Sequence, residues 1–148
     1  MKKIVIRFNA PVILAFALLS LLALLLGKWT DGAATYQYFS VYRASLSDPL
    51  TYVRFFGHVL GHADYEHYMG NMLLILLVGP GLEEKYGSGT MVWTIAVTAL
   101  VTGLVHFVFF PGSVLLGASG VVFMMIVLSS FTCLLYTSDA ADERSSVD

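Results

Sequence analysis

The sequence predicts an all-α integral membrane helical bundle, and two observations support this fold class. Of the 148 residues, 57% are hydrophobic and only 12% are charged, and the mean hydropathy is +0.78. Soluble domains have about 45–50% apolar and about 25% charged residues. The apolar residues also gather into runs close to the roughly 20 residues that a bilayer-spanning helix needs. We expect four spans, at residues 8–26, 66–82, 91–110 and 115–132.

The charge and cysteine content exclude several classes of protein and site. The formal net charge is -2, and no basic cluster beyond the N-terminus suggests binding to nucleic acid. Cys133 is the single cysteine, so an internal disulfide and a cysteine-based metal site are both excluded. The length is that of one domain. We therefore expect one membrane domain over residues 1–132, with the lipid bilayer as its surroundings.

The first span follows Lys2, Lys3 and Arg7 and has no charge between residues 10 and 26. A positive stretch before an apolar one is also typical of a signal peptide. Apolar residues continue upstream of the run, and residues 27–29 lack the small-residue cleavage pattern, which favours a spanning helix. The positive-inside tendency places the N-terminus in the cytoplasm. We expect a multi-pass protein of a prokaryotic plasma membrane.

Two connecting segments have a distinct character. Residues 27–61 are too polar to span and too aromatic for a free linker, so we expect them to lie at the membrane interface. Pro49 divides this segment into two short pieces, because the residue before a proline avoids helical conformation. Residues 83–89 combine charges with glycines, which indicates a solvated cytoplasmic loop.

The second span carries polar residues at its start. His67 and Asn71 are four residues apart and share one helix face, with Asn71 about 6 Å deeper along the axis. Polar groups inside a bilayer usually face the protein interior and often serve function; hydrogen bonding between helices is the alternative. A zinc site of His62 and His67 with Asp64 or Glu66 is disfavoured, because the five-residue histidine spacing fits one helix face poorly.

A small-residue turn, Gly117-Ala118-Ser119-Gly120, opens the fourth span. The second and fourth spans begin on the same side of the membrane, so His67 and Ser119 lie at similar depth. The His67 ring, the Asn71 amide and the Ser119 N–H could all hydrogen-bond an oxyanion. The flanking glycines allow the backbone to approach a substrate carbonyl. A serine becomes a nucleophile only beside a base, and simple helix packing is the alternative explanation.

The motifs together are specific in their order and spacing. They are His62-(x)4-His67-(x)3-Asn71, then Leu82-Glu83-Glu84-Lys85-Tyr86-Gly87-Ser88, then Gly117-Ala118-Ser119-Gly120, preceded by Arg54-Phe55-Phe56-Gly57-His58. From Pro11 to about Phe131 the chain resembles the rhomboid intramembrane serine proteases. It departs from them at Val53, where a tryptophan is often found.

This resemblance implies a serine endopeptidase that cleaves transmembrane protein substrates in or near the membrane, without metal or cofactor. It implies that Ser119 is the nucleophile, that His67 and Asn71 stabilise the oxyanion, and that Gly117 and the Ser119 N–H shape the same hole. It also implies a six-helix core, with four spans present here and the fourth one central. The alternative is a non-catalytic rhomboid-like protein that binds transmembrane partners.

The general base is missing from the matching motifs. In the family it is a histidine on the sixth helix, whereas this chain stops in the fourth span. His106 could stand in for it but matches no family motif, and His58 and His62 fit a loop-structuring role better. We therefore expect the general-base histidine to be absent and the chain as written to be inactive.

The end of the chain explains this departure. Residues 133–148, beginning Cys133-Leu134-Leu135-Tyr136-Thr137-Ser138-Asp139, resemble the translated read-through of a transposon-type sequencing adapter. We expect an artefactual tail in place of the missing helices; a genuine polar cytoplasmic tail is the alternative.

Overall fold

The computed structural model describes residues 9–145, with side chains as far as Leu134. Lys2, Lys3 and Arg7, on which the predicted orientation depends, lie outside the described residues. In the described part the regular structure is helical, with one isolated bridge between Val41 and Leu115 and no strand. The helices are α1 (Pro11–Trp29), α2 (Ala33–Tyr38), α3 (Pro49–Gly57), α4 (Tyr65–Tyr86), α5 (Ser88–Phe109) and α6 (Ser119–Ser145). The predicted all-α class is confirmed.

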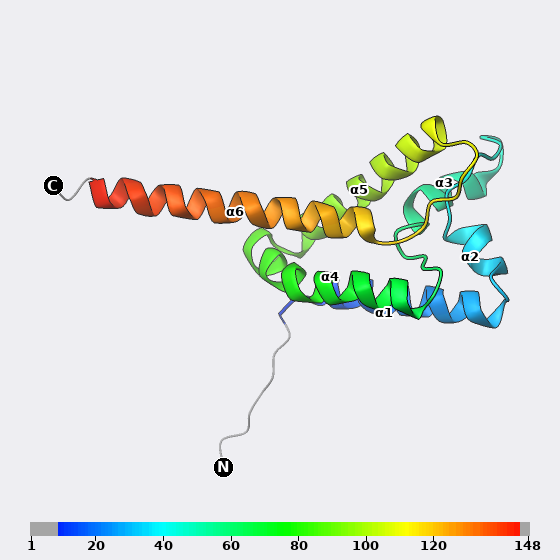
Figure 1. Ribbon diagram of the computed structural model, residues 1–148, viewed down its shortest axis with the longest axis horizontal. Helices are drawn as coiled ribbons and strands as arrows, with labels where there is room; N and C mark the ends of the chain where they lie inside the picture. Colours follow the sequence, from blue (N-terminus) through cyan, green and yellow to red (C-terminus); the bar gives the residue numbers. More distant parts are fainter. Residues whose placement is uncertain (1–8, 146–148) are drawn as a thin grey trace, which may run out of the picture.

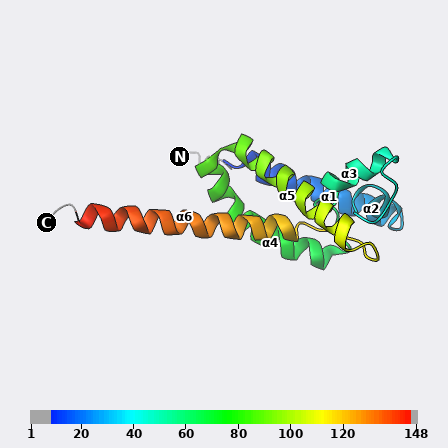
Figure 2. The same ribbon diagram turned by 90° about the horizontal axis from the view of Figure 1, so that it is seen from above.

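Helix α4 lies beside α1 (Figure 1) and also contacts α5 and α6, while α5 contacts α1 and α3 as well. Helix α6 packs on α4 and α5 and then extends beyond the other helices, as Figures 1 and 2 both show. Its opposite face is open, with Phe123 70% and Phe131 61% exposed. The described helices therefore cover only one side of α6.

Two of the helices are long and apolar enough to cross a membrane, α1 and α5. The apolar part of α6, residues 119–134, is shorter. Helix α4 has 22 residues, but polar side chains such as His67 and Asn71 in its first turns make it less apolar than α1 and α5. Among the described helices, α1 and α5 are thus the candidate membrane spans.

Helix boundaries differ from the predicted spans for local reasons. Helix α1 begins at Pro11, whose fixed φ suits the first helical position. Helix α4 begins after Asp64, whose side chain accepts a hydrogen bond from the His67 N–H at 2.8 Å. Helix α6 begins at Ser119 and not at residue 115, because Leu115 pairs with Val41 through two backbone hydrogen bonds of 2.8 and 2.9 Å.

Residues 27–61 contain two short helices, α2 and α3, and α3 begins at the expected break, Pro49. Asp48 caps α3 by accepting from the Leu50 N–H at 3.0 Å, and Pro49 takes the first helical position. Arg54 of α3 is 4% exposed and binds Asp48 at 3.2 Å and the Gln37 carbonyl at 2.9 Å. Its guanidinium also lies 4.6 Å from the centre of the Tyr42 ring. One buried cation therefore ties the two halves of the segment together.

The loop predicted at residues 83–89 is wrong, because α4 continues through it to Tyr86 and ends at Gly87. Glu83 is 2% exposed and is not solvated. Its carboxylate accepts hydrogen bonds from Val12 N–H at 3.0 Å, Ile13 N–H at 2.9 Å and the Ser88 hydroxyl at 2.6 Å. Because a helix N-terminus leaves N–H groups unsatisfied and is partly positive, the carboxylate of Glu83 caps α1.

The Glu83→Gln substitution tests this cap. We expect it to lower the free energy of unfolding by about 2 kcal/mol, because a neutral amide loses the charge and one acceptor oxygen. The neighbouring Glu84 is exposed and provides the control: Glu84→Gln should leave the thermal midpoint in detergent unchanged. Equal midpoints for the two variants would show that the cap does not stabilise the fold.

Candidate active site

Gly117 lies in direct contact with the start of α4. Its N–H donates to the His58 carbonyl at 2.9 Å, and its φ of +119° lies in the region that favours glycine. A Cβ at this position would come within 2.8 Å of both Cε1 and Nε2 of His67, and 3.8 Å from Nδ2 of Asn71. The structure therefore brings three of the predicted site residues together around the Gly117 backbone.

Ser119 follows two residues later as the first residue of α6. The first hydrogen bond of this helix runs from Val122 N–H to the Ala118 carbonyl at 2.9 Å, so the Ser119 N–H lies at the open, partly positive end of the helix. The Ser119 side chain is exposed. Its hydroxyl forms no hydrogen bond with any residue of the part that the structure describes. The hydroxyl is thus accessible, with no base attached.

His62 determines how the Asn71 amide is oriented. Its ring is 1% exposed; Nδ1 lies 3.1 Å from the Leu60 carbonyl, and Nε2 lies 3.1 Å from Nδ2 of Asn71. A carbonyl can only accept, so Nδ1 carries the proton and Nε2 accepts from Asn71. An amide nitrogen has two hydrogens, and the second one remains for an oxyanion. The sequence indicated a loop-structuring role for His62 but contained no sign of this pairing.

Burial of the ring lowers the pKa of His62 from 6.5 to about 4, against the opposing hydrogen bond to Leu60. Burial likewise lowers the pKa of His58. Both rings are therefore neutral at physiological pH. The His62 ring has to be neutral, because its Nε2 accepts the hydrogen bond from Asn71.

These pKa values predict acid sensitivity. The unfolded chain binds a proton at His62 near pH 6.5, and the folded chain only near pH 4. The free energy of unfolding contributed by neutral His62 is therefore complete above pH 6.5 and is lost as the pH falls. The loss reaches about 3 kcal/mol at pH 4. Thermal midpoints across this range should show the loss. The loss should shrink in His62→Gln, with the remainder due to His58; an unchanged pH profile would contradict the assignment.

His58 and His106 are each engaged in ring hydrogen bonds with backbone carbonyls other than those of the candidate site. His58 is 1% exposed, and its Nε2 lies 3.0 Å from the Ala99 carbonyl. Nε2 of His106 lies 3.2 Å from the Ser113 carbonyl, and the His106 ring stacks on Phe110. His106, considered above as a substitute base, is thus tied to the turn that follows α5.

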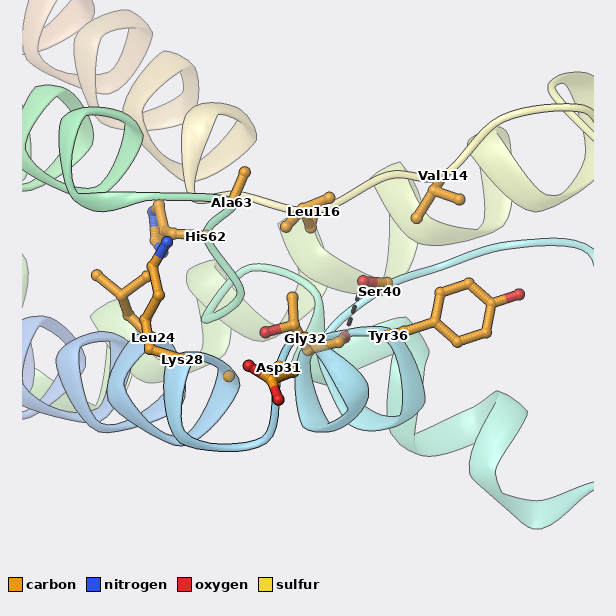
Figure 3. A pocket seen from close by; sticks show the side chains of 12 residues that line it. Leu24, Lys28, Asp31, Gly32, Tyr36, Ser40, His62, Ala63, Val114 and Leu116 are labelled. Atoms are coloured by element: carbon orange, nitrogen blue, oxygen red, sulfur yellow. Dashed lines mark hydrogen bonds between the residues drawn. The ribbon is translucent and has the colours of Figure 1, made fainter.

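A pocket of about 550 Å³ opens beside these residues (Figure 3). One wall comes from the end of α1 and from α2, and carries Lys28 and Asp31. The other wall holds His62 and Leu116, the residue directly before Gly117. The pocket therefore lies against both the residue that orients Asn71 and the loop that leads to Ser119.

Comparison with known families identifies the domain to which these residues belong. The sequence model of the Rhomboid domain matches residues 49–141, which is 93 of the 148 residues. The matched range includes His67, Asn71, Gly117 and Ser119. No curated protein matches the chain. Since the matched domain covers well over half of the chain, this helical membrane protein belongs to the rhomboid family.

Proposed function

We propose that the chain carries the nucleophile and the oxyanion site of an intramembrane serine endopeptidase that cleaves transmembrane protein substrates. The supporting observation is the position of His67 and Asn71 beside Gly117, two residues before an exposed Ser119: a Cβ added to Gly117 would lie 2.8 Å from the His67 ring and 3.8 Å from Asn71 Nδ2. In this proposal the domain lies in a prokaryotic plasma membrane with its N-terminus in the cytoplasm.

The proposed reaction is acyl transfer to Ser119. The hydroxyl oxygen attacks the scissile carbonyl carbon while a base removes its proton, and the carbonyl oxygen becomes an oxyanion. The Ser119 N–H, the second Asn71 amide hydrogen and the His67 ring donate to this oxyanion. The peptide C–N bond then breaks as the proton passes to the leaving amine. Water hydrolyses the acyl-serine and regenerates the hydroxyl.

The base is the missing part of this proposal. No histidine ring of the described chain bonds to Ser119, and the His62 and His58 rings are engaged elsewhere. We therefore propose that this chain does not hydrolyse peptides unless a base is supplied. We also propose that the 550 Å³ pocket receives a substrate side chain near the scissile bond, because the pocket borders the loop before Gly117.

Chemical rescue tests the proposal. The purified chain in detergent is treated with a fluorophosphonate probe, with and without added imidazole as an external base. We expect no labelling without imidazole and labelling at Ser119 that rises with imidazole concentration. Ser119→Ala should show none, and Ser113→Ala, which removes an exposed serine from the preceding loop, should label like the wild type.

The same experiment addresses the alternative of a non-catalytic rhomboid-like protein that binds transmembrane partners. The unpaired hydroxyl of Ser119 is the observation that favours this alternative. Absence of labelling at every imidazole concentration, in a chain that remains folded, would support it. Strong labelling without imidazole would instead contradict the proposed absence of a base.

A further inference from the structure

A second cavity, of about 330 Å³, lies between α1 and α5, apart from the residues around Ser119. All the side chains that line it are apolar. Each of the two helices contributes one face to the lining, with residues spaced by three or four positions along the helix. These residues are Val12, Ala15 and Leu19 of α1 and Val92, Ala96 and Ala99 of α5. We call this cavity the α1–α5 groove.

The α1–α5 groove lies at membrane depth, because α1 and α5 are the two described helices that are long and apolar enough to cross a bilayer. Seven residues separate Val12 from Leu19, and likewise Val92 from Ala99. Seven residues of helix rise about 10 Å. Phe56 of α3 and Leu60, which follows α3, also line the groove. Helix α3 contacts α5 and makes no contact with α1, so these two residues close the groove from the α5 side.

From this geometry we propose that an acyl chain of a membrane lipid occupies the α1–α5 groove. The lining offers no polar partner for water, and an empty apolar groove forfeits van der Waals contacts with its walls. A transmembrane helix needs about 30 Å of apolar surface, three times the length of the groove. A lipid chain is flexible, apolar and present in the surrounding bilayer, so one segment of it can fill the groove and match its apolar lining.

The walls of the groove are hydrogen-bonded to the residues that hold the candidate active site. The Ala99 carbonyl binds the His58 ring at 3.0 Å, and the His58 carbonyl accepts from Gly117 N–H at 2.9 Å. On the other side, the Leu60 carbonyl accepts from His62, which accepts from Asn71. The lipid chain therefore supports the backbone that positions Gly117 and the ring that positions Asn71.

Photo-cross-linking tests the occupancy of the groove. The full chain is reconstituted in phosphatidylcholine vesicles that contain a lipid with a diazirine in its acyl chain, and cross-links are mapped by mass spectrometry. Ala96→Phe fills the groove, whereas Val97→Phe changes the next residue of α5, which is 39% exposed and does not line the groove. We expect cross-links at groove residues to fall at least fivefold in Ala96→Phe only. Equal yields in both variants would overturn the proposal.

Ala15→Phe fills the groove from α1, with Leu14→Phe as its control, so the test does not depend on one variant that folds poorly. Hydrogen exchange tests the support of the site. Removing lipid should speed exchange of the Gly117 N–H by about tenfold in the wild type. It should have little effect in Ala96→Phe, whose ring replaces the chain. Equal acceleration in both proteins would show that the groove does not support Gly117. Neither readout depends on proteolysis.

Discussion

Replacing Gly117 with alanine is expected to abolish imidazole-dependent labelling of Ser119, with a fall of at least about 10³-fold in rate. The added Cβ would lie 2.8 Å from Nε2 and Cε1 of His67, a separation that real Cβ atoms do not tolerate. The φ of +119° is also one that L side chains rarely adopt. Either the His67 ring leaves the site or the loop moves, and both changes displace oxyanion donors from Ser119.

Gly112 provides a matched control in the same loop. No atom lies within 4 Å of a Cβ built there, and its φ is not in the strained region. Gly112→Ala should therefore label at the wild-type rate in the presence of imidazole. If Gly117→Ala labels as fast as Gly112→Ala, the close approach of His67 to Gly117 has no part in the reaction.

The Asn71→Ala substitution should slow the same reaction by about 10²- to 10³-fold, as the loss of one oxyanion donor does in serine enzymes. The amide is held by the bond from Nδ2 to His62 Nε2, 3.1 Å long, so its second hydrogen has a fixed direction. The probe should still label Ser119, because Ser119 itself is unchanged, and only the rate of labelling should fall.

Glu66→Ala changes an exposed side chain on the first turn of the same helix and provides the control for Asn71→Ala. We expect a wild-type labelling rate from it. Thermal midpoints of both variants separate loss of fold from loss of donor. A rate for Asn71→Ala within a few-fold of wild type, in a folded protein, would contradict the oxyanion role.

Much of the fold follows from local patterns along the sequence. The apolar runs predicted the long helices α1 and α5, and Pro49 marked the start of α3. The errors arose where distant contacts override local preference. The sequence predicted helix at residues 115–118, but Leu115 pairs with Val41 and α6 begins only at Ser119.

The candidate site shows the same division. Helical spacing placed His67 and Asn71 on one face, and the small residues around Ser119 indicated a tight turn at a helix start. Two contacts had no signal in the sequence: the His62–Asn71 pair and the cap of α1 by Glu83. Glu83 read as a solvated loop residue, because only the antiparallel packing of α4 against α1 brings it to the N–H groups of Val12 and Ile13.

The position of the phosphonyl oxygen in a phosphonate adduct of this chain is the most direct test of the candidate site. The adduct would be formed in the presence of imidazole and its structure determined in lipid. We predict a covalent bond to Ser119 Oγ, with the phosphonyl oxygen within hydrogen-bond distance of Asn71 Nδ2, the His67 ring and the Ser119 N–H. An adduct on another residue, or an oxygen directed away from Asn71 and His67, would contradict the assignment of this site.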